Sequence, residues 1–590
     1  MLISKRCRNL KKFGTIFIFC IITLASYYRY SLAKIHFAHV DDIGVAVTIL
    51  PKNYQHDEKV RQINNLSDPL YSSTKFKIYR GLDSVGLLSV FSEVNNALYA
   101  QKRIGLHWTY APAQFFFTSF FLNSDNSYRD NLFWGRFPSL VFGILSIFLL
   151  FLVTRKYFNE DELYYSFVSV SMLSFSWLSV IYSAQMESYA VGLLCALIIL
   201  FLFNDRVKNH SLSLKKACFQ GIVLGALCWF QYQSILFMPA FWVASFYKDM
   251  SEKSNDLKTV LKFNIVSGLF LCAIFFRVYT KYLHLHSAGV NWNVGNEGQF
   301  LFNISNVEGL FSKVFYPFKF FVLNIFHVLN GNLGVLPESN PLQIVISLFY
   351  YFLIGLACYR FFKFESIRKN SYALLFTATF GTWAIFILAQ KLTLSPTRHL
   401  LMLLPMIIFL IIEGVGLVFE KLQVSHKNRY FICLGWSLLL TVSFASGYGE
   451  QKDKRKDQFE TAYFEKLIKK YHVDFVVQGN CTYNLSLMRS ITNLVPVFRI
   501  CGSGGWSRNP ETKAQRILFA DQLTNMRSLT FDSVSRQANR ALGENTNVMG
   551  LISDYKVLYK HEVKSLRVVS HSKLLGNGTN GLFVYILEHI

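Results

Sequence analysis

Two adjacent carboxylates, Asp41 and Asp42, follow the first long apolar segment of the chain. That segment, Ile16 to Leu32, is long enough to span a bilayer, because roughly 17 to 25 mostly apolar residues cross a hydrocarbon core of about 30 Å. The pair therefore falls where lipid gives way to water. Two neighbouring carboxylates at such a surface suit proton abstraction or cation binding. A solvated loop start is the alternative interpretation.

Basic residues that could meet a lipid phosphate occur in two places. Lys102, Arg103 and His107 precede an aromatic stretch over residues 108–121, and a cationic cluster beside aromatic side chains at a membrane surface can hold a phosphate. Arg398 follows Pro396 by two residues, at the expected outer end of a later span. For each of these residues, anchoring at the level of the lipid headgroups is the alternative.

The composition of the chain indicates that a fold spanning a membrane positions these residues. Of the 590 residues, 52% are hydrophobic, with 57 Phe, 31 Tyr and a mean hydropathy of +0.29, and the apolar residues form long runs. The net charge of +24 comes mostly from Lys and Arg between these runs, so it indicates membrane topology and not a nucleic-acid partner. The sequence therefore predicts a polytopic α-helical membrane protein.

About eleven helices are expected to cross the membrane, each with the length that a bilayer requires. The expected spans are 14–32, 136–154, 163–183, 187–203, 217–231, 234–247, 260–279, 342–359, 372–390, 399–419 and 430–447. The segments at 217–231 and 234–247 are short and closely joined, so they form either one hairpin or one kinked helix.

Loop charges set the orientation. Basic residues precede the first span and recur in alternate loops, which predicts that these loops and the N-terminus are cytoplasmic. Segments 33–135, 280–341 and 448–590 then face outward. The first span lacks a convincing small-residue cleavage site, so we expect it to remain as a helix.

The chain is expected to have two domains, a transmembrane domain over 1–447 and an extracytoplasmic α/β domain over 448–590. Within the second domain, Phe459 to Tyr471 is typical of an amphipathic helix, and strands are expected at 473–477, 495–500 and 582–587. Cys481 and Cys501 lie in this outward domain and could form a disulfide in an oxidising compartment, with two free thiols as the alternative.

A metal site is left open by the sequence. The ten cysteines lack the paired spacing of a zinc site. His284, His286 and Glu297 in the second outward segment could coordinate a divalent metal ion, and a polar loop that binds nothing is the alternative. No cofactor is certain.

Several motifs, taken in order, resemble GT-C glycosyltransferases, in the branch of the protein O-mannosyltransferases and the lipid A aminoarabinose transferase. The resemblance covers about residues 14–420. The motifs are Asp41-Asp42, Leu106-His-Trp-Thr-Tyr-Ala-Pro-Ala-Gln-Phe115, Trp134-Gly-Arg-Phe-Pro-Ser-Leu-Val-Phe-Gly-Ile-Leu-Ser146, Tyr182-Ser-Ala-Gln-Met-Glu-Ser-Tyr-Ala190 and Ser395-Pro-Thr-Arg-His-Leu-Leu-Met-Leu-Leu-Pro405.

The resemblance implies a sugar donor linked to polyprenyl phosphate and an acceptor that is a lipid, a glycan or a protein. It implies that Asp41 or Asp42 is the catalytic carboxylate and that Lys102, Arg103 and Arg398 hold the donor phosphate. His107, Glu187 and Tyr189 are further candidates for contact with sugar or acceptor. The family often has Arg where this chain has Glu187.

A second class of function stays open, namely a transporter or flippase of lipid-linked sugars or other envelope precursors. Transporters tend to have internal repeats and charged residues at mid-membrane. Inspection finds no convincing repeat, and apart from Glu413 the charged residues cluster at the ends of spans. The enzyme is therefore favoured, in a bacterial inner membrane, with sugar and acceptor unspecified.

Overall fold

The structure is a computed structural model of the whole chain, and it describes a subset of the residues. These are 2–35, 117–118, 120–121, 128–158, 162–186, 189–208, 214–251, 265, 268–269, 272, 309–332, 341–363, 366–389, 401–454, 466–478, 497–499, 516–523, 555–563 and 581–589. By their contacts they divide into two units. The first holds most of the helices, up to Ser31 and from Pro138 to Tyr448, and the second holds the end of α1, the start of α8 and the strands.

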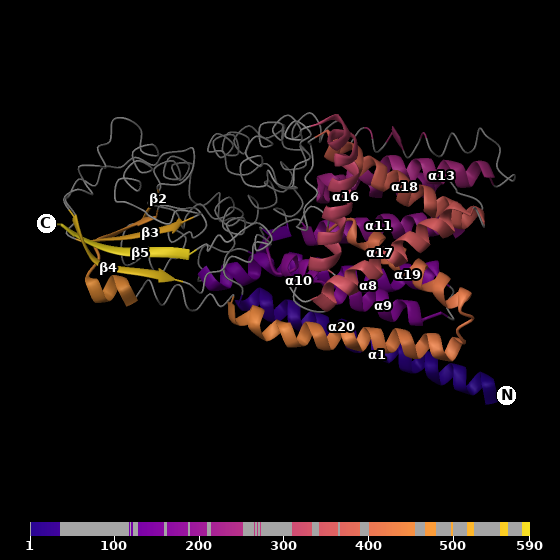
Figure 1. Cartoon of the computed structure of the whole chain (residues 1–590), viewed down its shortest axis with the longest axis horizontal. Helices are drawn as coiled ribbons and strands as arrows, with labels where there is room; N and C mark the ends of the chain where they lie inside the picture. Colours follow the sequence, from indigo (N-terminus) through magenta and orange to yellow (C-terminus); the bar gives the residue numbers. More distant parts are fainter. Residues whose placement is uncertain are drawn as a thin grey trace. The chain divides into compact units, whose positions relative to one another are not determined.

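The first unit is a bundle of helices (Figure 1). The helices of the chain are α1 (Leu2–Ile35), α8 (Tyr128–Tyr157), α9 (Tyr164–Ser174), α10 (Trp177–Tyr182), α11 (Tyr189–Lys208), α12 (Leu214–Phe230), η2 (Tyr232–Phe237), α13 (Met238–Ser251), α16 (Leu310–Asn332), α17 (Pro341–Phe362), α18 (Ile367–Leu388), α19 (Leu404–Lys421) and α20 (His426–Lys454). Among the described residues, six of them are long and apolar enough to cross a membrane: α1, α8, α11, α17, α18 and α20. The chain is an integral membrane protein.

Helices α9 and α19 lie in the core of the first unit. Every residue of α9 is buried, and so is almost all of α19. A helix that is apolar around its whole circumference is stable only when other helices or lipid enclose it. The two helices contact each other where the Tyr165 hydroxyl lies 3.0 Å from the Cβ position of Gly416.

Two parts of the first unit differ from the sequence prediction. The expected single span at 163–183 is two helices, α9 and α10, because the helix stops at Phe175 and Ser176 caps a new one by accepting a hydrogen bond from the Ser179 amide. A further helix, α16, lies within segment 280–341, for which no helix was predicted. It carries exposed Val314, Phe315 and Phe318.

The strands of the second unit form one mixed sheet in the order β2-β1-β3-β5-β4. They are β1 (Phe475–Gln478), β2 (Val497–Arg499), β3 (Arg516–Leu523), β4 (Tyr555–Val563) and β5 (Gly581–His589). Strand β1 is parallel to β2 and β3, while β5 runs antiparallel to β3 and β4. The three strands predicted from sequence correspond to β1, β2 and β5, and helix is present at 466–471. The division into domains at residue 447 stays a prediction.

Candidate functional site

Most residues that the sequence nominates for chemistry lie outside the described part of the chain. These are Asp41, Asp42, Lys102, Arg103, His107, Glu187, Arg398, Cys481 and Cys501, together with His284, His286 and Glu297. Their roles stay predictions. Tyr189 is described, and it opens α11 with its ring centroid 5.2 Å from that of Tyr182. Among the described residues, no group of three or more His, Cys, Asp or Glu could hold a metal ion.

Tyr182 and Tyr189 bracket the motif turn, residues 182–186, which leads from α10 to the start of α11. This turn defines what we call the motif end of the first unit, where α11 and α19 begin. The amide side chain of Gln185 is buried here, and its oxygen has no hydrogen-bond partner among the described residues.

Arg29 of α1 anchors the motif turn. Its guanidinium is completely buried and donates to the carbonyl oxygens of Leu173 (3.2 Å) and Ser174 (2.8 Å) at the end of α9. It also donates to the hydroxyls of Ser179 (2.8 Å) and Ser183 (3.3 Å). Arg29 is not among the residues predicted from sequence to form the site, although an ionisable residue inside an apolar span is a functional signal in itself.

Three segments far apart in the chain converge at Gly192, one turn into α11. A Cβ at this glycine would lie 3.1 Å from both Gln231 Cγ and Met402 Cγ. Gln231 precedes η2 and donates a hydrogen bond to Gln233 (3.3 Å), while Met402 lies in the turn before α19. The fold therefore packs the turn that follows Arg398 in sequence against α11 at the motif end.

In the second unit, Arg136 near the start of α8 fixes the end of α1. Its side chain is completely buried and donates from Nη1 to the Ala33 carbonyl oxygen at 3.1 Å. The last carbonyls of a helix have no partner within the helix, so a guanidinium is a suitable donor for them. Trp134 and Phe137 pack around Phe121 in the same unit. Trp134 and Phe137 of the Trp134-Gly-Arg-Phe motif therefore have a structural role in this unit.

Ion pairs gather at the opposite end of the first unit, which we call the basic end, where α8, α11, α13 and α17 finish in basic residues. Arg206 pairs with Asp249, and both are buried. Glu413, the one acidic residue that lies inside an expected span and not at its end, accepts a hydrogen bond from Tyr157 and pairs with Arg360. Because Glu413 is neutralised by fixed partners, it has the features of a structural tie between α8, α17 and α19.

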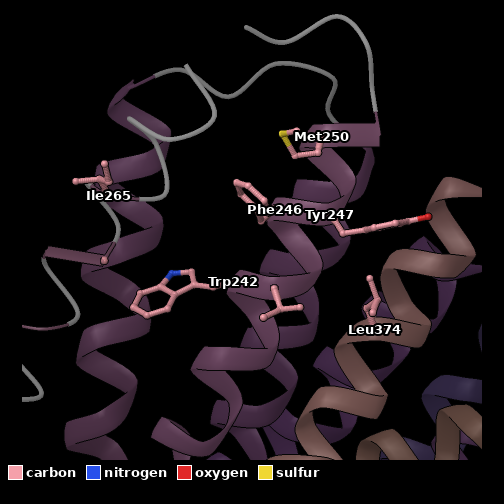
Figure 2. A pocket seen from close by; sticks show the side chains of 8 residues that line it. Trp242, Phe246, Tyr247, Met250, Ile265 and Leu374 are labelled. Carbon is pink, nitrogen blue, oxygen red and sulfur yellow. The ribbon is translucent and has the colours of Figure 1, made fainter. Parts of the chain in front are cut away.

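An open apolar groove of about 840 Å³ lies near the basic end (Figure 2). Its lining comprises Trp242, Val243, Phe246, Tyr247, Met250, Ile265, Gly268 and Leu374. Figure 2 shows Trp242 projecting from α13 toward the helical residue Ile265, and Leu374 facing α13 from α18. The exposed lining is almost wholly apolar, because the Tyr247 hydroxyl accepts a hydrogen bond from Asn370, so in a membrane we expect the groove to face lipid chains.

The fold and the motif end define an integral membrane protein with a buried polar cluster at one end of its helices. A family model described as dolichyl-phosphate-mannose-protein mannosyltransferase matches residues 112–278, which include the motif turn and Arg136. Over these residues, the match confirms the resemblance to GT-C superfamily glycosyltransferases.

Two further comparisons concern whole proteins. The crystal structure of the Archaeoglobus fulgidus oligosaccharyltransferase in complex with zinc and sulfate aligns with a TM-score of 0.42 and 11% identity, over 85% of this chain and 67% of that one. A search of curated proteins found no match.

Proposed function

We propose that this protein is a membrane glycosyltransferase that moves a sugar from a polyprenyl-phosphate carrier to an acceptor at the outer face of the membrane. The observation that carries the proposal is the family match over residues 112–278, which contains two of the sequence motifs. The acceptor is a lipid, a glycan or a protein, each of which can offer the hydroxyl or other nucleophile that the transfer needs.

In the proposed reaction, Asp41 or Asp42 removes the proton from an acceptor hydroxyl. The acceptor oxygen then bonds to the anomeric carbon as the bond from that carbon to the phosphate oxygen breaks. The electron pair of the broken bond leaves with polyprenyl phosphate. Lys102, Arg103 and Arg398 neutralise the charge that develops on this leaving group. His107, Glu187 and Tyr189 contact the sugar or the acceptor.

The proposed placement has the N-terminus in the cytoplasm and residues 448–590 outside as an α/β domain, in a bacterial inner membrane. The gathering of basic residues at one end of the helices supports this orientation, because Lys and Arg are enriched in cytoplasmic loops. The mixed sheet β2-β1-β3-β5-β4 supports an α/β domain in the tail.

The test is release of polyprenyl phosphate by the purified protein in liposomes, from a panel of donors that differ in the sugar, with cell-envelope extract as the source of acceptor. We expect release from at least one donor together with transfer of its labelled sugar to the extract. A parallel assay with a chelator determines whether a divalent metal ion takes part. Absence of release from every donor would contradict the proposal, whereas movement of an intact donor across the bilayer would favour a flippase.

A further inference from the structure

We infer that Arg29 is a positioning residue that sets the geometry of the motif turn. The inference rests on the proposed function, because that function assigns sugar or acceptor contacts to Glu187 and Tyr189. It concerns Arg29 of α1 together with α9 and α10, all of which lie within the first unit. No direct contact of Arg29 with substrate is implied.

The hydrogen bonds of Arg29 use all five of its donors. Nε donates to Ser183 Oγ, Nη1 to the Ala25 and Ser174 carbonyls, and Nη2 to the Leu173 carbonyl and Ser179 Oγ. Four of these acceptors are 144 to 154 positions away in the sequence. One side chain therefore joins α1 to both sides of the break between α9 and α10.

The break itself explains why an arginine is present. A helix that ends inside a buried core leaves its last carbonyl oxygens without partners, and Leu173 and Ser174 are at this position in α9. A planar guanidinium can donate in several fixed directions at once, which an ammonium group cannot do. Among the described residues, the hydrogen-bond partners of Arg29 are all neutral, so its role is to satisfy the break and not to neutralise an acid.

Ser183 transmits this constraint to the motif turn. It is the first residue after α10, and its hydroxyl both accepts from Arg29 and donates to the Ser179 carbonyl at 2.5 Å. Gly143 of α8 faces it, and a Cβ on that glycine would overlap the Ser183 side chain. Ser183 is thus held between α1 and α8, two residues before the buried Gln185 and six before Tyr189. A change at Arg29 or Gly143 should move the same turn from opposite sides.

The experiment compares Arg29→Lys and Gly143→Ala with two matched controls. Arg206→Lys alters another buried arginine, at the basic end, and Gly355→Ala adds a methyl group to a helix position with open space around it. Amide hydrogen exchange over residues 173–186 and the kinetics of polyprenyl phosphate release are measured for each full-length variant in liposomes.

We expect faster exchange over residues 173–186 in Arg29→Lys and Gly143→Ala than in either control. We also expect kcat to fall by about 100-fold in Arg29→Lys with the donor KM nearly unchanged, since a small misplacement far from the reacting atoms can cost that much. Exchange equal to the controls, or activity lost only in proportion to folded protein, would overturn the inference. If the wild type releases no polyprenyl phosphate, the proposed function fails, and the exchange data alone then decide whether Arg29 holds the turn.

Discussion

Arg360 of α17 and Glu413 of α19 form a buried ion pair, with Arg360 Nη1 3.5 Å from Glu413 Oε2. Tyr157 of α8 donates a hydrogen bond to the same carboxylate. Arg360 also reaches Glu420 at 2.9 Å, but Glu420 is about half exposed and that contact contributes little. The pair between Arg360 and Glu413 therefore ties three helices together in a region that excludes water.

Removal of one partner of this pair should cost more stability than removal of both. Arg360→Met leaves the Glu413 carboxylate buried without its cation, for which we expect a loss of about 3 to 5 kcal/mol in the free energy of unfolding. The double variant Arg360→Met with Glu413→Leu should recover most of this loss. Denaturant titration in detergent micelles measures the free energy of unfolding of each variant. Equal losses in the single and double variants would contradict the expected coupling.

Because α19 packs closely on α17, substitution of Gly414 should lower the stability of the protein. A Cβ on Gly414 would overlap the backbone of Leu353, which cannot move without displacing α17. We expect Gly414→Ala to cost about 1 to 3 kcal/mol through overpacking. Gly355→Ala, where the added carbon meets nothing within 4 Å, should be neutral or stabilise by up to about 1 kcal/mol. The same titration distinguishes Gly414→Ala from Gly355→Ala. Equal effects of the two substitutions would show that α17 and α19 are not in contact at Gly414.

The groove at α13 should be in contact with lipid chains. Trp242 lines this groove, whereas Trp383 is almost completely buried among the helices. Brominated lipids quench tryptophan fluorescence on contact, so Trp242→Phe should remove a measurable part of the quenching and Trp383→Phe almost none. Equal contributions from the two tryptophans would mean that the groove is closed to the bilayer.

The helices could be predicted from sequence wherever an apolar run had both the length and the flanking charges of a span. That signal located the C-terminal ends of α1, α11, α17 and α18 to within a few residues. It failed between α9 and α10, because hydropathy does not change at Phe175, where tertiary hydrogen bonds from Arg29 stabilise the break. It also missed α16, whose Lys313, Pro317 and Lys319 interrupt the apolar pattern.

The sequence predicted which types of residue form the candidate site, but not which residues contact one another there. The motif containing Tyr182 and Tyr189 was recognised as a linear pattern, but its dependence on Arg29 joins residues about 150 positions apart, and no local spacing records such a contact. The same holds for Gly192, Gln231 and Met402, which meet only through helix packing. For the contact of Arg29 with the motif turn, the one signal available from sequence was an Arg within an otherwise apolar span.

We propose that Asp41 or Asp42 is the general base in the transfer of sugar from polyprenyl phosphate. The most direct measurement compares release of polyprenyl phosphate by the wild type, Asp41→Asn and Asp42→Asn, each reconstituted in liposomes and checked for intact folding. We predict that one variant loses activity by about 10² to 10⁴-fold, the contribution of a positioned general base, while the other retains more of it. Equal rates in all three proteins would contradict this proposal, because catalysis would then not depend on Asp41 or Asp42.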